Sequence, residues 1–267
     1  MNKVTGFTTL LASFGNPNKG NPGPEGYNLA LNAMGADYVF LAFEVAEIQS
    51  ALKATRDLGF GGCIVTKPFK QEIMKYLDDI DSDAQTIGAV NVVVNESGRL
   101  KGFNSDWVGS TNALKSKIDI KGKRIALLGA GGAAKAAAFG LFTSGSNAVV
   151  FNRTKETGKI VADQYGFEYG GDLNAIDDSF DIIINATSIG FRDDYGSVPV
   201  DESVLLSKPL VFDIVASPKR SRLIELAGSL GCETIAGSEM IAFHAQRALK
   251  LLTGQEPPLD LLSAHFF

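Results

Sequence analysis

A glycine-rich turn is the segment whose residue types and spacing point most directly to chemistry. Gly129, Gly131 and Ala134 follow the apolar run Ile125–Leu128 and open an alanine-rich helical stretch. In this pattern the first glycine permits a tight turn, the second lets the backbone approach a pyrophosphate, and the small third residue lets helix and strand pack closely. The helix N-terminus then offers unpaired N–H groups to phosphates. The pattern predicts a dinucleotide site, although glycines also serve tight packing alone.

The end of the next predicted strand indicates which dinucleotide would bind. An NAD site usually has Asp or Glu there, which holds the ribose hydroxyls. This chain has Asn152, Arg153 and Thr154 instead. The Arg153 guanidinium is a planar fork suited to a 2′-phosphate, and its face could stack on adenine. The alternative is a solvated basic turn. The pattern favours NADP, with NAD as the less favoured cofactor.

A lysine near the end of another apolar run could move a proton. Lys70 follows the run Cys63–Val65, and Pro68 suits the first turn of a helix because its missing N–H costs nothing there. That would place Lys70 in the first turn, where the helix dipole disfavours a cation by up to about 1 kcal/mol. A disfavoured charge suits proton transfer near neutral pH. The alternative is an exposed lysine whose stem covers apolar surface.

Asp106 belongs to a polar segment that precedes a predicted helix. Asn104, Ser105 and Asp106 come just before the helical pattern Val108–Ser116. Taken alone, these residues are typical N-cap residues.

Short apolar runs alternate with helical patterns along most of the chain. This alternation predicts parallel sheets with helices on both faces, hence an α/β fold. A domain boundary is expected near Asp106, after which a new series of strands and helices begins. The expected helices include Val45–Asp57, Gly132–Thr143, Ser221–Leu230 and Ser238–Leu252. The expected strands are Thr8–Ser13, Tyr38–Phe43, Cys63–Val65, Ala89–Val94, Ile125–Leu128, Ala148–Phe151, Asp181–Asn185, Val211–Val215 and Glu233–Ile235.

Composition excludes several classes of protein. The formal net charge is −5, without a long basic run, which argues against nucleic-acid binding. The two cysteines, Cys63 and Cys232, are too few for a disulfide framework and lack metal-site spacing. No apolar stretch reaches the ~18 residues of a membrane span, and no signal peptide is recognisable. We expect a cytoplasmic protein without a metal.

In their order along the chain, seven motifs resemble those of the shikimate/quinate dehydrogenases, of which this chain looks like a divergent shikimate dehydrogenase-like member. They are Ile64-Val65-Thr66-Lys67-Pro68-Phe69-Lys70, Gly88-Ala89-Val90-Asn91, Gly102 to Gly109, Gly129 to Ala133, Asn152-Arg153-Thr154, Asn185 to Gly190, and Gly237 to Ile241 with Leu252-Thr253-Gly254.

The resemblance implies a division into two domains with a cleft between them. The first is a substrate-binding and catalytic α/β domain of residues 1–105, completed by the C-terminal region 238–267. The second is a Rossmann-type NADP domain of residues 106–237.

The resemblance also implies an activity, a reversible hydride transfer between NADP(H) and a secondary hydroxyl or ketone of shikimate or a related alicyclic hydroxy acid, in aromatic amino acid biosynthesis. Lys70 and Asp106 would be the catalytic residues, and whether the lysine transfers the proton or only polarises the oxygen stays open. Substrate would contact Thr66, Asn91, Ser105, Asn21, His244 and Gln246. Cofactor would contact Gly129, Ala130, Gly131, Gly132, Ala133, Asn152, Arg153, Thr154, Thr187, Ser188, Ile214 and Gly237.

Some positions depart from the family pattern. Asn21 and Gly23 stand where two serines hold the substrate carboxylate, and Ile64 replaces an asparagine. Ala216 replaces a tyrosine, and His244 replaces a glutamine, with Gln246 nearby. Missing hydrogen-bond donors should weaken binding of shikimate itself.

The alternatives are a weak or inactive NADP-binding regulatory homologue and a quinate- or aminoshikimate-type dehydrogenase. We expect a monomer or homodimer that binds a small molecule and neither nucleic acid nor membrane.

Overall fold

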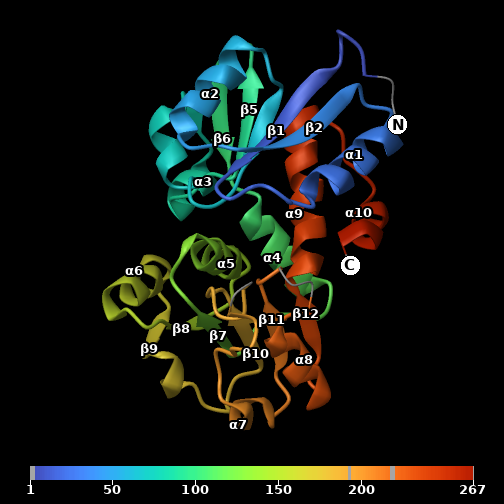
Figure 1. Ribbon diagram of the computed structural model, residues 1–267. Coiled ribbons are helices and arrows are strands. Elements are labelled where there is room, and N and C mark those ends of the chain that lie inside the picture. The colour runs from blue at the N-terminus through green and yellow to red at the C-terminus, as the bar shows by residue number, and fades with distance from the viewer. Residues whose placement is uncertain (1–3, 192–193, 217–219, 267) are drawn as a thin grey trace. The chain divides into compact units, whose positions relative to one another are not determined.

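The computed structural model describes residues 4–191, 194–216 and 220–266, and the chain divides into two compact units (Figure 1). Unit 1 contains residues 1–105 and 244–266, and unit 2 contains residues 106–243. The predicted first domain resumes at residue 238, whereas unit 1 resumes at His244, inside a helix. Residues 1–3, 192–193, 217–219 and 267 of the predicted domains lie outside the described part.

The sheet of unit 1 has six strands in the order β2-β1-β3-β5-β6-β4. The strands are β1 (Thr9–Gly15), β2 (Tyr38–Glu44), β3 (Gly62–Val65), β4 (Asp79–Ile80), β5 (Val92–Glu96) and β6 (Arg99–Phe103). The expectation of a parallel sheet is wrong here, because β5 runs antiparallel to both β3 and β6. Strands β5 and β6 are joined only by Ser97 and Gly98, both with positive φ. A two-residue connection joins antiparallel strands, whereas parallel strands need a long crossover.

Five helical segments and part of a sixth complete unit 1. They are α1 (Gly23–Ala33), α2 (Ile48–Asp57), η1 (Glu72–Tyr76), α3 (Ser82–Ile87), α10 (Leu259–Phe266), and the C-terminal part of α9 (Gly237–Thr253). Helix α10 packs on α1, where the Tyr27 and Phe266 rings meet edge to face at 6.5 Å. A Cβ on Gly26 would lie 2.5 Å from Phe266, so only glycine permits this approach.

The position expected for Lys70 within a helix is wrong. Residues 67–71 form turns, in which the Phe69 N–H donates to the Thr66 carbonyl, and the next helical segment is the 3-10 helix η1. The Lys70 carbonyl accepts the Val90 N–H at 2.8 Å, which ties this turn to the start of the β5 strand. The helix-dipole argument for Lys70 therefore does not apply.

The sheet of unit 2 is parallel throughout, in the order β12-β11-β10-β7-β8-β9. The strands are β7 (Ile125–Leu128), β8 (Ala148–Phe151), β9 (Glu168–Gly171), β10 (Ile182–Asn185), β11 (Leu210–Asp213) and β12 (Thr234–Ala236). The central strands β7 and β10 are buried at every residue, as expected for a sheet covered on both faces.

The helices of unit 2 are α4 (Asp106–Lys115), α5 (Gly132–Thr143), α6 (Lys155–Tyr165), η2 (Leu173–Ala175), α7 (Glu202–Leu205), α8 (Arg222–Ser229) and the first part of α9. Helices α5 and α6 follow strands on one side of β7, and α8 follows β11 on the other side. Because crossovers between parallel strands are right-handed, the two groups cover opposite faces of the sheet. The predicted Rossmann-type arrangement of this unit is confirmed. No described helix is long and apolar enough to cross a bilayer.

Gly62 gives a test of the unit 1 sheet. Its φ is 150°, and a Cβ would lie 2.2 Å from the Val93 carbonyl oxygen of the neighbouring strand. We expect Gly62→Ala to lower the free energy of unfolding by about 2–4 kcal/mol, measured by denaturant titration. Gly228, in α8, has nothing within 4 Å of a built Cβ. As the control, Gly228→Ala should raise stability by about 0.5–1 kcal/mol. Equal unfolding midpoints for the two variants would contradict the crowding at Gly62.

Candidate active site

The strand order of the unit 2 sheet reverses between β7 and β10. Strands β7 and β10 are neighbours, but the chain leaves β7 toward β8 and leaves β10 toward β11 (Figure 1). Ligands of open parallel sheets bind at such a point. Gly129 follows β7 with a φ of 107°, and a Cβ there would lie 2.9 Å from the Ala186 carbonyl oxygen beyond β10. Glycine is therefore required at the turn.

The start of α5 fits the pyrophosphate of a dinucleotide. A Cβ built on Gly131 or Gly132 meets no atom within 4 Å, so the space in front of this backbone is open. Gly131 is the N-cap residue and has no side chain with which to cap the helix. Ala134, the small third position, is fully buried where α5 packs on the sheet. The residues present can hold phosphate oxygens with backbone N–H groups.

Arg153 lies beyond the end of β8, in the next loop along this edge. It is exposed, and within the described part of the chain it has neither a hydrogen-bond nor an ion-pair partner. The Asn152 amide holds the loop itself, donating to the Thr154 carbonyl at 2.7 Å and to Thr157 Oγ1 at 2.8 Å. The guanidinium is thus free to bind a phosphate, whereas the Asn152 side-chain donors are already used.

Two buried side chains fix the loops after β10 and β11. Asn185 Oδ1 accepts hydrogen bonds from Thr187 N (3.0 Å) and Thr187 Oγ1 (2.7 Å), and its Nδ2 donates to Asp213 Oδ1 at 2.9 Å. Asp213 also accepts from Val215 N at 3.0 Å and from the Ser221 hydroxyl. Burial raises the pKa of Asp213 from 3.8 to about 6, although these three hydrogen bonds lower it in part. Both carboxylate oxygens therefore have partners.

The remaining predicted cofactor residues lie on the same edge. The Ile214 N–H donates to the Asn185 carbonyl at 2.9 Å, and Ser188 is exposed beyond Thr187. A Cβ on Gly237 would lie 2.6 Å from the Val215 carbonyl oxygen, so the start of α9 packs directly on the loop after β11. Ala130 and Ala133 flank the open turn and are half-buried. Unit 2 thus gathers all the predicted cofactor residues at one edge of its sheet.

In unit 1, His244 is the centre of a cluster of polar side chains. Ser105 Oγ lies 2.6 Å from His244 Nδ1, Asn91 Nδ2 lies 3.4 Å from the same nitrogen, and the Tyr27 hydroxyl lies 3.3 Å from Nε2. Asn91 and Ser105 are fully buried. The cluster joins helices α1 and α9 to the two ends of the β5–β6 hairpin.

The donor and acceptor roles of Asn91 and Ser105 are compatible with both tautomers of His244. Asn91 Oδ1 accepts the Ser105 N–H at 2.8 Å, so Asn91 Nδ2 faces Ser105 Oγ and His244 Nδ1. Ser105 Oγ can donate to His244 Nδ1 at 2.6 Å, or it can accept from Nδ1–H while it donates to Asn91 Oδ1 at 3.4 Å. With either tautomer, both ring nitrogens have protein partners.

The loop before α1 uses its asparagines internally. Asn21 Oδ1 accepts the Gly23 N–H at 2.8 Å, and Asn21 Nδ2 donates to Asn18 Oδ1 at 2.8 Å and Ser13 Oγ at 3.4 Å. A Cβ on Gly23 would lie 2.9 Å from Asn21 Oδ1. Lys19, almost fully exposed, pairs with Glu44 at 3.8 Å. In this arrangement the Asn21 amide supports the loop, and a serine at position 23 would displace it.

Of the remaining predicted site residues, Thr66, Lys70 and Gln246 belong to unit 1, and Asp106 belongs to unit 2. Thr66 and Lys70 are half-buried in unit 1, and a Cβ on Gly15 would lie 2.4 Å from Thr66 Oγ1, so the ends of β1 and β3 are very close. Asp106 is buried at the first residue of α4, in unit 2. Gln246 donates to the Pro257 carbonyl at 3.0 Å, and no contact joins it to the His244 cluster among the described hydrogen bonds.

Sequence reasoning missed Tyr27, Ser13, Asn18 and the supporting role of Asp213. A signal existed for Asp213, since a polar residue directly after a buried strand lies at the carboxyl edge of the sheet. Tyr27 gave none, because its ring stacks on Phe40 at 4.4 Å as a core residue does and only its hydroxyl reaches the cluster. Trp107 packs edge to face on Phe139 of α5 at 5.3 Å.

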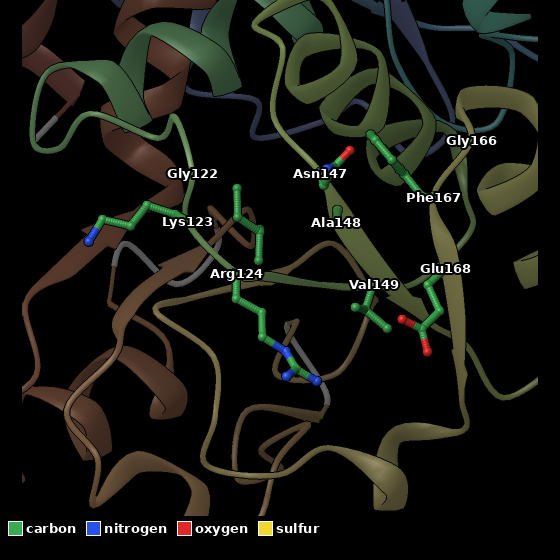
Figure 2. A pocket seen from close by; sticks show the side chains of 10 residues that line it. Gly122, Lys123, Arg124, Asn147, Ala148, Val149, Gly166, Phe167 and Glu168 are labelled. Atoms are coloured by element: carbon green, nitrogen blue, oxygen red, sulfur yellow. The ribbon is translucent and has the colours of Figure 1, made fainter.

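An open cavity of about 410 Å³ lies at the other edge of the unit 2 sheet. Figure 2 shows that its lining residues come from the starts of β7, β8 and β9, among them Arg124, Ala148 and Glu168. The Arg124 guanidinium lies over the Phe180 ring at 4.7 Å, and Lys123 pairs with Asp181 at 3.7 Å. The basic groups there are already partnered, and the glycine turn lies at the opposite edge. Among the described residues no cluster could hold a metal ion.

Two family models match the chain, one in each of the two units. The family model for the shikimate dehydrogenase substrate binding domain matches residues 14–93, and that for shikimate/quinate 5-dehydrogenase matches residues 112–191. A shikimate dehydrogenase (NADP(+)) of Pyrococcus abyssi is 36% identical over 251 residues, 93% of each chain.

Solved structures extend the similarity to nearly the whole chain. A crystal structure of a shikimate dehydrogenase in complex with NADP+ is 34% identical, with a TM-score of 0.92 over 99% of this chain and 96% of that chain. The shikimate 5-dehydrogenase from Thermus thermophilus, in complex with NADP(H) and shikimate, is 30% identical, with a TM-score of 0.89 over 97% of this chain and 98% of that chain.

The raised pKa of Asp213 predicts how stability depends on pH. The folded state binds this proton more tightly than the unfolded state, so the associated stability is complete below the unfolded pKa of 3.8 and is lost as pH rises through about 6. Asp213→Asn keeps an oxygen for Asn185 and Val215 but cannot titrate. We expect the unfolding free energy of the wild type to fall by about 2–3 kcal/mol relative to this variant between pH 4 and 6.5. Parallel pH profiles in denaturant titrations would contradict the prediction.

Proposed function

Because the chain belongs to the shikimate dehydrogenase family, we propose that it catalyses reversible hydride transfer between NADP(H) and shikimate or a related alicyclic hydroxy acid. The reacting group is a secondary hydroxyl or the corresponding ketone, so the chain is an oxidoreductase. The observation that carries the proposal is the open backbone at Gly131 and Gly132, with Arg153 exposed beyond the next strand.

We propose NADP as the cofactor, and it supplies the redox chemistry by accepting or donating the hydride. The N–H groups at the start of α5 hold the pyrophosphate, and Arg153 binds the 2′-phosphate with its planar fork. Thr187, Ser188, Ile214 and Gly237 border the nicotinamide half.

The protein must handle the proton that accompanies each hydride. Alcohol oxidation releases a proton from the hydroxyl, and ketone reduction requires one. We propose that the neutral Lys70 amine takes this proton during alcohol oxidation and that the resulting ammonium returns it during ketone reduction. The Asp106 carboxylate would orient the amine and stabilise the ammonium form. Both roles follow from the family motifs that contain these residues.

A neutral hydrogen-bonding group of unit 1 would bind a substrate hydroxyl. Thr66, which is half-buried, is the proposed direct contact. Asn91 and Ser105 are fully buried and bonded to each other and to His244, so these three residues would act by fixing the surrounding backbone. Asn21 orders the loop before α1. Gln246 is not among the proposed substrate contacts, because its amide donates to the Pro257 carbonyl.

Turnover by the purified protein tests the proposed activity. We expect the protein to reduce NADP in the presence of shikimate, quinate or an amino-substituted analogue. The absorbance of the reduced nicotinamide measures this reaction. Lys70→Ala should lower kcat by at least ~10²-fold, because positioned proton transfer contributes that much. Lys75→Ala, which removes an exposed lysine from η1, should leave kcat unchanged. Tight NADP binding without turnover on any of these acids would favour a non-catalytic homologue.

Cofactor choice gives a separate test. We expect Arg153→Ala to raise KM for NADP by ~10–100-fold and to leave KM for NAD within about twofold, since one charge-assisted pair to the 2′-phosphate is lost. The matched control is Lys159→Ala, which removes an exposed charge from α6. A wild type that prefers NAD, or an equal loss with both cofactors, would refute the role of Arg153.

A further inference from the structure

A chain of hydrogen bonds runs from Asp213 through Asn185 to the loop after β10. Asp213 Oδ1 accepts Asn185 Nδ2 at 2.9 Å, Asn185 Oδ1 accepts the N–H and hydroxyl of Thr187, and Thr187 Oγ1 accepts the Ile189 N–H at 3.1 Å. Asn185 and Asp213 are both completely buried. Each link has a defined donor and acceptor.

Asp213 determines which way the Asn185 amide points. The carboxylate can only accept, so it requires the NH₂ end of Asn185, and the carbonyl end must then face Thr187. Were the amide reversed, its NH₂ group would face the Thr187 N–H, and this half-buried donor would lose its acceptor. The Asn185 Nδ2 also donates to the Ile189 carbonyl at 3.3 Å, so the same orientation closes the loop from its other end.

The held loop is part of the edge that receives the cofactor. Ala186, its first residue, is the group against which Gly129 packs, and the Ile214 N–H donates to the Asn185 carbonyl. On the far side, Asp213 accepts from Ser221, whose oxygen caps α8 by accepting the Ile224 N–H at 3.3 Å. One carboxylate therefore connects the loops after β10 and β11 with the start of α8.

We infer that Asp213 is a positioning residue for cofactor binding, which acts through Asn185 to hold residues 186–190 beside the glycine turn. This rests on the proposed binding of NADP(H) at the carboxyl edge of unit 2. Asp213 itself is enclosed and touches neither substrate nor cofactor in this role. It differs from a residue that only stabilises the fold, because its effect on the cofactor passes through one identified amide.

Fluorescence titration with NADPH on the whole protein tests the inference. We expect Asp213→Ala to weaken NADPH binding by ~10-fold or more, and Asp213→Asn, which keeps an oxygen toward Asn185, to restore binding to within about threefold of wild type. In an Asn185→Ala background, Asp213→Ala should cause little further loss, because the amide through which it acts is gone.

Two further measurements separate this role from general destabilisation. Without cofactor, hydrogen exchange at the Thr187 and Ile189 amides should quicken in Asp213→Ala and not in Asp213→Asn. Asp181→Ala is the matched control, since Asp181 holds Arg124 N at 2.9 Å at the opposite edge of the same sheet and should leave NADPH affinity unchanged.

The outcomes are distinguishable. A folded wild type that binds no NADPH overturns the proposed function. A wild type that binds NADPH, with Asp213→Ala losing thermal stability but no affinity, overturns the inference alone. The inference is also overturned if the losses of NADPH affinity caused by Asn185→Ala and Asp213→Ala are fully additive in the double variant.

Discussion

The buried hydrogen bond between Asn185 and Asp213 is the interaction on which the carboxyl edge of the unit 2 sheet depends. A carboxylate taken out of water is costly unless hydrogen bonds replace its hydration. Here an amide, a backbone N–H and a hydroxyl do so, and each belongs to a different segment. The requirement to satisfy one charge thus fixes several loops at once. Burial raises the pKa of Asp213 by more than these three hydrogen bonds lower it.

Unit 1 meets the same physical demand with a network of side chains. Asn91, Ser105 and His244 are hydrogen-bonded to one another, and within the described chain no buried side-chain nitrogen or oxygen lacks a partner. Such networks are rigid, since each rotation would break a bond in a medium of low dielectric constant. The hydroxyl of Tyr27 completes the network from a ring that otherwise belongs to the hydrophobic core. Rigid neutral groups favour recognition of hydroxyls through geometry.

Local patterns predict the strand directions of unit 2 better than those of unit 1. The strand Ile125–Leu128 and the helix Gly132–Thr143 have their predicted bounds, because uninterrupted apolar runs and alanine-rich stretches encode one element each. In unit 1, the alternation of strands and helices predicts a parallel sheet, because it does not indicate the short Ser97-Gly98 turn that makes β5 and β6 antiparallel. Pro68 alone predicts a helix at Lys70, whereas the position of Lys70 depends on the hydrogen bond from Val90, twenty residues away. The His244–Tyr27 pair depends on a separation of 217 residues that no local pattern encodes.

Helix α9 has a consequence for how the chain acquires its structure. Its first residues belong to unit 2 and those from His244 onward to unit 1, so unit 1 is discontinuous and all of unit 2 is inserted within it. During synthesis the N-terminal sheet emerges long before α10, whose Phe266 covers Gly26 and meets Tyr27. Unit 1 can therefore cover this apolar surface of α1 only after unit 2 has been synthesised, whereas the residues of unit 2 from 106 to 243 form one continuous segment. The unit that begins first is thus the last to be finished.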